Sequence, residues 1–486
     1  MMKSSSLANL GVDVLINIMV FLRPPDIISL RQTCKALQAS TMHRIVWIDA
    51  LEQMMEEHHI PKATFPTASM DRKALEHTAL SPAKFSSVME KSVDNEIHPC
   101  SIRILPDHLS KQERLKYRIM SSMGYSEILL VPGGRFLLTS QVVLTPVGKI
   151  FLQLWDIGAE GQARVLVESF LEDSPIRLHS LSPMPDGNGF YLFSERLCNP
   201  QAIIVHKILA FGPFPSITHV NKQPIPDHVI SHSISATRLV CVCYSGTIIV
   251  WNFEEQLLAS WDSRVRPNAD LPLSVHFYAD NVLLYHSGQL MLWKIPEMHP
   301  DSQGAPLQHQ RLSTFSALFE DPDDDDSDAE EDTYLLPQCP WTSGRAGSEF
   351  LGISKLSKFG LFRVQHLPRV PGDNIPSVLP SRTAIIPGFD LADVCAGVDM
   401  SALQLCNRRL MVSGLASDGN SVYIQMLPVL VDGSMVQPLP RKELFLRNQD
   451  LTTSSPQLCP ATGRLCIVIG DTDIHILDYI QPPQHS

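Results

Sequence analysis

The sequence predicts a mainly β protein, with a small N-terminal α-helical module followed by a C-terminal seven-bladed β-propeller. Three observations predict this fold class. From about residue 100, short apolar runs alternate with Gly, Pro, Asn, Asp and Ser, a pattern typical of all-β domains. One kind of apolar run recurs seven times along this part of the chain. In residues 10–51, by contrast, the apolar stretches are typical of packed helices.

The propeller, residues 100–480, is predicted from two runs that repeat in the same phase. The first has alternating apolar positions and often ends in Trp plus a polar residue; it occupies 149–157, 201–209, 246–254, 288–296, 360–368, 421–429 and 471–479. Equivalent positions are 42 to 72 residues apart, and most of these gaps match a four-stranded blade. The second run precedes the first in every unit, at 135–140, 190–195, 237–243, 281–286, 348–354, 408–414 and 464–470. Both runs support seven units, with six or eight as alternatives.

The ends of the predicted β region suggest how a ring would close. The last unit ends near Tyr479 without an outer strand, and the remaining residues are rich in Pro. Residues 101–105 form a strand-like run that lies before the four strands of the first unit. Because an open propeller would expose unpaired strand edges, we predict that residues 101–105 supply the missing outer strand.

One short segment carries most of the formal net charge of -12. Glu320 to Asp332 holds ten acidic residues and no basic one; without it, 41 acidic residues face 39 basic ones. The segment lies in the widest gap between units, so we predict a disordered insertion at 318–332. A solvated linker is the simpler interpretation. The alternative is a regulatory segment, because Ser327 precedes acidic residues as acidophilic kinase sites do and is a candidate phosphorylation site.

Several classes of function lack their motifs in this chain. The near-neutral body has no Lys/Arg cluster, so no nucleic-acid partner is predicted. No run of 18 apolar residues exists, so no membrane span is predicted. The sequence has no HExxH, paired CxxC or GxSxG motif, and we expect no metal, cofactor or catalytic residue. Ten scattered cysteines and no signal peptide predict a cytoplasmic or nuclear protein with reduced thiols.

The N-terminal region divides into a helical module, residues 7–52, and a partly helical connector, residues 53–99. Between residues 12 and 22 only Asp13 and Asn17 are polar, so a helix there is apolar on most of its surface. It is too short to span a bilayer. A module of about 45 residues is also too small to bury such a helix alone. We therefore expect part of this surface to contact another protein.

The same stretch resembles an F-box. That family combines Leu-Pro, an acidic position, a hydrophobic helix, a Pro-containing turn, a second helix, a Cys-Lys/Arg pair and a late Trp. The matching residues here are Leu10-Gly11, Asp13, Val14-Leu15, Ile18, Phe21-Leu22, Pro24-Pro25-Asp26, Ile28, Leu30, Cys34-Lys35, Leu37 and Trp47. The match covers about one tenth of the chain, and Gly11 stands where the family has Pro. In the β region, three motifs resemble the third strand of WD repeats: Leu154-Trp155-Asp156, Val250-Trp251-Asn252 and Leu292-Trp293-Lys294.

Together the two resemblances imply a fungal-type F-box substrate receptor of a cullin-based (SCF-type) E3 ubiquitin ligase. In such a non-catalytic subunit, the F-box binds a Skp-family adaptor and through it a cullin, while the propeller holds a protein substrate for degradation. The implied adaptor contact consists of Leu10, Gly11, Val14, Leu15, Ile18, Leu22, Pro25, Ile28 and Leu30, with Trp47 closing the module. Loops after Ser140, Glu195 and Tyr244 are unranked candidates for substrate contact. The alternative is a non-ligase propeller scaffold with a degenerate F-box.

Overall fold

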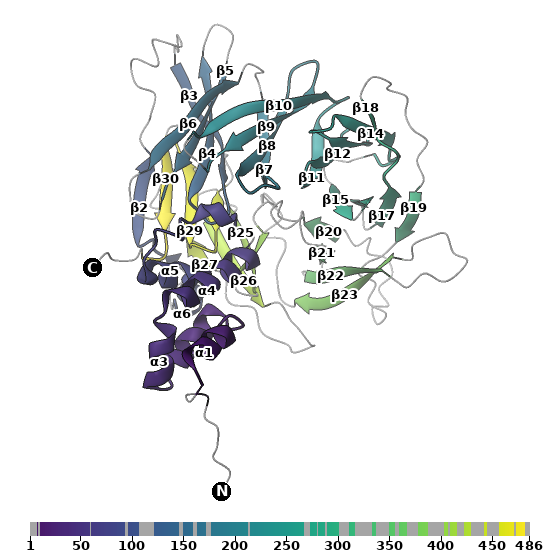
Figure 1. The fold of residues 1–486 in the computed structure, drawn as a ribbon. Helices are drawn as coiled ribbons and strands as arrows, with labels where there is room; N and C mark the ends of the chain where they lie inside the picture. Colours follow the sequence, from purple (N-terminus) through teal and green to yellow (C-terminus); the bar gives the residue numbers. More distant parts are fainter. Residues whose placement is uncertain are drawn as a thin grey trace.

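A computed structural model gives the fold of the 486-residue chain (Figure 1). The acidic segment 318–332 and Ser327 lie outside the described residues, so the expectations for both stay predictions. The structure describes residues 7, 10–58, 60–92, 96–105, 121–144, 149–158, 163–171, 176–211, 214–266, 273–278, 280–286, 289–300, 311–315, 333–336, 349–354, 359–366, 378–386, 403–406, 409–415, 422–428, 442–444, 456–470 and 473–481.

The N-terminal region is helical, as expected. Pro24 and Pro25 occupy the first turn of α2, where a missing backbone N–H costs no hydrogen bond. Asp71 caps α5, because its side chain accepts a hydrogen bond from the backbone N–H of Ala74 at 2.7 Å. The helices are α1 Val12–Met19, α2 Pro24–Arg31, α3 Lys35–Thr41, α4 Arg44–Glu57, the short 3-10 helix η2 Lys62–Thr64, α5 Arg72–Ala79 and α6 Ser81–Lys91. Helix α4 crosses the expected module boundary between residues 52 and 53.

The rest of the described chain forms seven sheets, here called the first to the seventh in chain order. Figure 1 shows them following one another around a common centre. The first sheet contains β3 Ser121–Leu130, β4 Phe136–Leu144, β5 Lys149–Asp156 and β6 Arg164–Leu171; the second, β7 Ile176–Pro183, β8 Gly189–Arg196, β9 Ala202–Leu209 and β10 Ser216–Pro224; the third, β11 Val229–Ser235, β12 Arg238–Cys243, β13 Thr247–Asn252, β14 Leu257–Asp262 and β18 His299–Pro300. The fourth contains β15 Leu273–Tyr278, β16 Asn281–His286, β17 Gln289–Lys294 and β19 Arg311–Phe315; the fifth, β20 Thr333–Leu336, β21 Glu349–Ser354, β22 Phe359–His366 and β23 Val378–Ile386. The sixth contains β24 Leu403–Cys406, β25 Arg409–Leu415, β26 Val422–Pro428, β27 Lys442–Leu444 and β1 Glu96–Ile97; the seventh, β28 Gln457–Cys459, β29 Arg464–Ile469, β30 Asp473–Asp478 and β2 Ser101–Leu105.

Every repeated apolar run of the sequence coincides with a strand. In each sheet the earlier run pairs antiparallel with the later one, giving the pairs β4–β5, β8–β9, β12–β13, β16–β17, β21–β22, β25–β26 and β29–β30. The molecule is therefore mainly β with N-terminal helices. A closed ring of seven blades stays a prediction.

Two strands reach the β region from the end of the connector. β2 pairs antiparallel with β30 over its whole length, with Ser101 opposite Asp478 and Leu105 opposite Ile474. β1 pairs in parallel with β27 of the neighbouring sheet. The ten residues from 96 to 105 thus contribute outer strands to two successive sheets.

Apolar side chains fill the spaces between those neighbouring sheets whose side chains the structure describes. Trp155 shares a core with Cys466 and Ile476 of the seventh sheet, and its Nε1 donates to Thr139 Oγ1 at 3.1 Å. Trp251 packs with side chains of the second sheet, and Trp293 packs with side chains of the third. Each of these Trp residues therefore packs between its own sheet and a neighbouring one, which fits a structural rather than a ligand-binding position.

Candidate protein-interaction surface

Helix α1 carries apolar side chains on two faces. Leu15 and Met19 lie four residues apart and face the interior, each 2% exposed. Val14, Ile18 and Phe21 lie at i, i+4 and i+7, so at roughly 3.6 residues per turn they share a second face. Phe21 extends the helical turn, because its backbone N–H donates to Ile18 O at 3.1 Å. We call these three residues the α1 face.

The α1 face points toward solvent. Phe21 is 84% exposed and Val14 is 48% exposed, whereas Ile18 is half-buried. The helical module does not cover this face: its core contains Leu15, Met19 and Ile27, and none of the three residues of the α1 face belongs to it. An apolar face of this kind is typical of a helix that packs against a partner.

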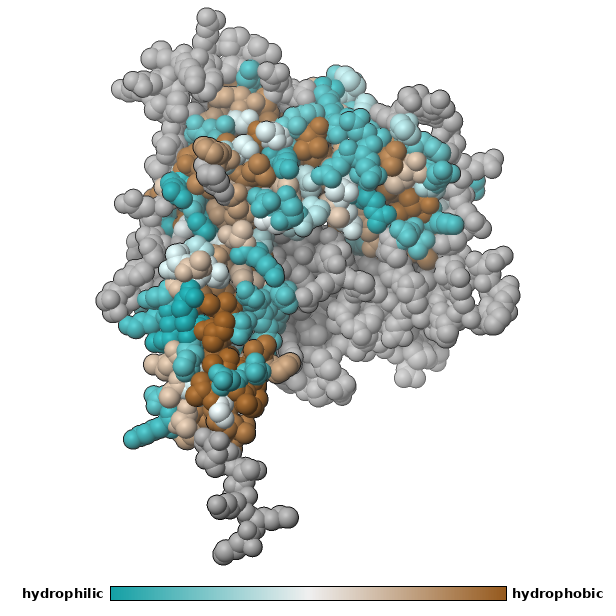
Figure 2. Space-filling model, in the orientation of Figure 1, coloured by the Kyte–Doolittle hydropathy of each residue, from teal (hydrophilic) through white to brown (hydrophobic). Residues whose placement is uncertain are grey.

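Exposed large apolar side chains are concentrated on the helical module. Among the residues with described side chains there are thirteen of them, and eight lie between residues 7 and 45: Leu7, Leu10, Val12, Val14, Val20, Phe21, Met42 and Ile45. Figure 2 shows a continuous area of hydrophobic colour over the N-terminal helices, with separate areas over the sheets. Contiguous exposed apolar surface marks protein interaction sites more often than single exposed residues do.

The residues implied by the F-box resemblance occupy three environments. Leu10, Gly11 and Val14 are exposed. Ile18, Leu22, Pro25, Ile28 and Leu30 are half-buried. Leu15 and Trp47 lie inside the module, 2% and 0% exposed, so neither side chain is available on the surface. No direct test of the adaptor contact follows from this placement, and the contact stays a prediction.

Trp47 organises the interior of the helical module. Its Nε1 donates to Thr41 O at 2.9 Å, and the Arg31 guanidinium lies over its ring at 5.3 Å from the centroid. Arg31 also donates two hydrogen bonds to the Glu76 carboxylate of α5, at 2.8 and 2.9 Å. The role of Trp47 is therefore to hold the module together and to align it, through Arg31, with the connector.

Gly11 has the backbone conformation that a proline would fix. Its φ is -59° and its ψ is 149°, and it precedes the first turn of α1. Proline has a φ near about -65°. A Cβ at Gly11 would meet nothing within 4 Å. The departure from the family pattern at Gly11 thus leaves the local shape unchanged.

Sequence reasoning did not select the most exposed member of the α1 face. Phe21 was matched to the F-box pattern but was not named as an adaptor contact, and Val12, Val20, Met42 and Ile45 were not named either. The i, i+4, i+7 spacing of Val14, Ile18 and Phe21 is the signal that could have found it. The exposure of Met42 and Ile45 depends on how α3 and α4 pack, which no local spacing reveals.

Apart from the apolar surface of the helical module, a cluster of polar side chains joins the second and third sheets. Glu195 is fully buried; its carboxylate accepts hydrogen bonds from His179 Nε2 at 3.1 Å, His228 Nδ1 at 2.8 Å and the backbone N–H of Val229 at 3.3 Å. His232 lies beside His179, with ring centroids 5.1 Å apart, and burial lowers its pKa to about 3. His232 is therefore neutral at physiological pH. The cluster holds two sheets together through hydrogen bonds to an ionised carboxylate.

The first strand of the first sheet, β3, contacts the first strand of the second sheet, β7, through a further carboxyl group. Burial raises the pKa of Glu127 to about 7, although a hydrogen bond from the backbone N–H of Leu178 at 2.6 Å opposes this change. Glu127 lies on β3 and Leu178 lies on β7. Like Glu195, this side chain connects neighbouring sheets.

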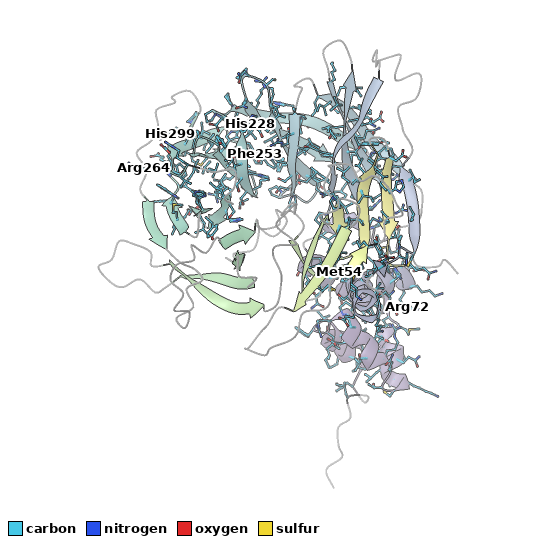
Figure 3. The ribbon with its side chains drawn as sticks, turned by 180° about the vertical axis from the view of Figure 1, so that it is seen from behind. Met54, Arg72, His228, Phe253, Arg264 and His299 are labelled. Carbon is cyan, nitrogen blue, oxygen red and sulfur yellow. The ribbon has the colours of Figure 1, made fainter. Side chains whose placement is uncertain are left out.

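The three loops considered for substrate contact are placed differently. Ser140 is buried within β4, which continues to Leu144, so no loop follows it directly. The turns after Glu195 and Tyr244 lie close together, because the Tyr244 N–H donates to His228 O at 2.9 Å and His228 contacts Glu195. Figure 3 shows His228 among the side chains of this part of the molecule.

The described residues show two further features. No three His, Cys, Asp or Glu side chains among them are grouped to hold a metal ion. Within the same part of the chain, no helix is both long enough and apolar enough to cross a bilayer.

Comparison with known proteins adds only structural likenesses. No protein-family model matches the chain, and no curated protein matches it. One similar solved structure is the β-propeller domain of Cps50 (Swd1) from Myceliophteria thermophila, with 14% identity, a TM-score of 0.43, and coverage of 74% of this chain and 98% of that one. Another belongs to a mitotic checkpoint complex, with 9% identity, a TM-score of 0.39, and coverage of 80% and 98%. The class of protein, mainly β with N-terminal helices, rests on the strand order and register described above.

Proposed function

We propose that this chain is the substrate-recognition subunit of a cullin-based (SCF-type) E3 ubiquitin ligase. In this proposal the helical module is an F-box that binds a Skp-family adaptor, and the seven sheets close into a propeller that binds a protein substrate. The chain itself supplies no catalytic residue and acts in the cytoplasm or nucleus. The observation that carries the proposal is the exposed apolar surface of the helical module, at the stretch that resembles an F-box.

The size of that surface supports a partner of substantial affinity. Full burial of one large apolar side chain contributes about 1.5–3 kcal/mol. The α1 face offers Phe21 and Val14 together, with Leu10 and Val12 exposed nearby in the sequence. A partner that covered these apolar side chains would remove them from water, and their burial would stabilise the complex.

The connector supports the proposal because it attaches the helical module firmly to the sheets. Phe85 and Met89 of α6 are buried in one core with Tyr479 of the C-terminal segment. Cys459 and Ala461, at the start of the seventh sheet, belong to the core of the helical module. A substrate held by the sheets would therefore keep a defined position relative to a bound adaptor.

The test is capture of a purified Skp-family adaptor and cullin by the tagged chain. We expect the wild-type chain to capture both. We expect Phe21→Asp to weaken adaptor binding at least tenfold, because a charge would replace the most exposed side chain of the α1 face. Leu15 is unsuitable for this purpose, since its substitution would disrupt the core.

The matched control is Phe214→Asp. Phe214 is 85% exposed, nearly the same as Phe21, but lies between β9 and β10. It should leave adaptor binding unchanged, and both variants should unfold at the wild-type temperature. Absence of adaptor capture by the wild-type chain would refute the ligase proposal and leave the scaffold alternative. Equal binding by wild type and Phe21→Asp would show that the α1 face is not the contact.

A further inference from the structure

Two large apolar side chains are exposed together at one end of the third sheet. Tyr244 directly follows β12 and is 58% exposed, although the preceding Cys243 is completely buried. Ile230 of β11 is 41% exposed. Cys243 pairs with Val229, so the start of β11 and the end of β12 lie at the same end of the sheet. Adjoining exposed apolar side chains, aromatic ones above all, mark protein interaction sites.

A β-bulge explains the exposure of Ile230. Val229 pairs with Cys243 and Ser231 pairs with Val242, so Ile230 is an extra residue with no counterpart on β12. A bulge interrupts the alternation of a strand and re-aims the side chain of the extra residue. Val229 therefore stays buried, while the next side chain along the strand faces solvent.

Hydrogen bonds from two segments hold the turn that carries Tyr244. Its backbone N–H donates to His228 O at 2.9 Å, and the N–H of Ser245 donates to Asp227 Oδ2 at 2.9 Å. The second segment contributes Arg266, whose Nη1 donates to Ser245 O at 2.8 Å. The turn is thus fastened both to the residues before β11 and to the residues after β14.

The turn ends on a glycine that its backbone conformation requires. Gly246 has a φ of 85°, and a Cβ there would collide with Val265 O. Gly246 O also accepts a hydrogen bond from Ser263 Oγ at 2.7 Å. A turn fixed in this way presents a tyrosine that loses little conformational entropy on binding, which is the property of an anchor residue.

Two arginines follow β14 at the same end of the third sheet. Asp262, the last residue of β14, pairs with Thr247, the first residue after the turn. Arg264 is exposed, and the Arg266 side chain is 71% exposed. The Asp262 carboxylate accepts from the N–H of Arg264 at 2.7 Å and lies 3.5 Å from Arg266 Nη1. These three side chains together carry a net positive charge.

A third arginine belongs to the adjoining end of the second sheet. Arg177 of β7 is exposed and pairs with Glu195 of β8. The buried Glu195 carboxylate accepts from His228 Nδ1 at 2.8 Å, and His228 O accepts from the N–H of Tyr244. Figure 3 labels His228 and Arg264, which lie at these ends of the two sheets. The name Tyr244 surface is used below for Arg177, Ile230, Tyr244, Arg264 and Arg266.

We propose that the Tyr244 surface binds an acidic peptide segment of a partner protein, with an apolar side chain of that segment packed against Tyr244 and Ile230. Guanidinium groups favour carboxylate partners through paired hydrogen bonds. Tyrosine and arginine are also among the residues that contribute most to protein interfaces. The inference rests on the part of the proposed function in which the sheets hold a protein substrate, and it names the chemical class of the segment they recognise.

The test begins with selection of short random peptides, displayed on phage, by the immobilised full-length chain. We expect enrichment of peptides in which Asp or Glu flanks an apolar residue. Fluorescence anisotropy of one enriched peptide, labelled and free of phage, should show binding that weakens as salt is added. No enrichment, or enrichment of peptides without acidic residues, would overturn the proposal.

Two matched pairs of variants locate the contact. Tyr244→Ala should weaken peptide binding at least tenfold, whereas Phe214→Ala should leave it within twofold of wild type. Phe214 is 85% exposed but lies between β9 and β10, at the opposite end of the second sheet. The Tyr244 variant keeps the backbone hydrogen bonds of the turn, so it should unfold at the wild-type temperature. Equal effects of the two substitutions would overturn the proposal.

The second pair tests the charge. Arg266→Gln should weaken peptide binding at least threefold and reduce its dependence on salt, because one cation has left the contact. Arg164→Gln should do neither. The Arg164 side chain is also 71% exposed and 3.5 Å from an aspartate, but Arg164 starts β6 at the opposite end of the first sheet. An unchanged salt dependence in Arg266→Gln would contradict recognition of an acidic segment at this surface.

Failure of this inference is distinguishable from failure of the ligase proposal, because the peptide assay contains no adaptor and the capture assay contains no substrate. A chain that captures the adaptor but selects no acidic peptide would refute the inference alone. A chain that binds acidic peptides through the Tyr244 surface but captures no adaptor would support the inference within the scaffold alternative.

Discussion

Removal of residues 1–106 is expected to prevent the β region from folding. The truncation takes away β2, which pairs with β30 along its whole length, and β1, which pairs with β27. It also removes Phe85 and Met89, which are buried against the sixth and seventh sheets. Losing one such core side chain costs about 2–5 kcal/mol. The combined loss is comparable to the whole stability of a typical domain, about 5–15 kcal/mol.

The measurement is solubility and thermal unfolding, followed by circular dichroism, of a fragment that starts at Asp107. We expect an insoluble or unfolded product. A fragment lacking residues 1–43 serves as the control, because it retains α4 to α6 and both added strands; its sheets should still unfold in a cooperative transition. A fragment starting at Asp107 that is soluble and as stable as the full chain would contradict closure of the ring by residues 101–105.

Asp478→Ala is expected to destabilise the chain by about 3–5 kcal/mol, the cost of leaving a buried charge without its partner. Asp478 accepts from Arg464 Nε at 2.6 Å and from Arg103 Nη2 at 3.0 Å. Both arginines continue to carbonyl groups of the first sheet's loops, with Arg464 Nη1 3.0 Å from Gly158 O and Arg103 Nη1 2.7 Å from Ile157 O. This network joins the seventh sheet to the first, so its loss should loosen the contact between these two sheets.

Denaturant unfolding of Asp478→Ala measures the effect, with Asp280→Ala as the control. Asp280 also contacts an arginine, Arg238, at 3.4 Å, but its side chain is 94% exposed. Exposed ion pairs contribute about 0–1 kcal/mol, so this control should change little. Similar losses in the two variants would show that the Asp478 network does not hold the junction.

Two strands of each sheet could be predicted from the sequence, and their physical cause is local. In the sheets whose side chains the structure describes, the two apolar runs carry alternating side chains that fill the space between neighbouring sheets, so period and spacing suffice to locate them. The two-residue strands β1 and β18 could not be predicted, because so few residues carry no pattern. The Asp478 network was also not predictable, since Arg103 and Arg464 lie far apart in the chain and meet only when β2 and β29 pair on either side of β30.

The exposure of the N-terminal apolar stretch could be predicted in part, and its use as a contact surface stays a prediction. The apolar stretch of residues 12–22 indicated a contact surface, and the structure leaves much of it exposed. The resemblance did not distinguish Leu15, which points into the core, from Val14, which points outward. That difference depends on which side of α1 packs against α3 and α4, and a helix that is apolar on most sides does not encode it locally.

Hydrogen exchange of the full-length chain, with and without a saturating Skp-family adaptor, tests the central claim most directly. The account predicts that the adaptor slows exchange of backbone amides in residues 12–22 and the neighbouring α2, because covering the α1 face suppresses local opening there. Amides of the first four sheets should exchange at unchanged rates. Absence of binding, or protection confined to the sheets, would contradict an adaptor-binding function of the helical module.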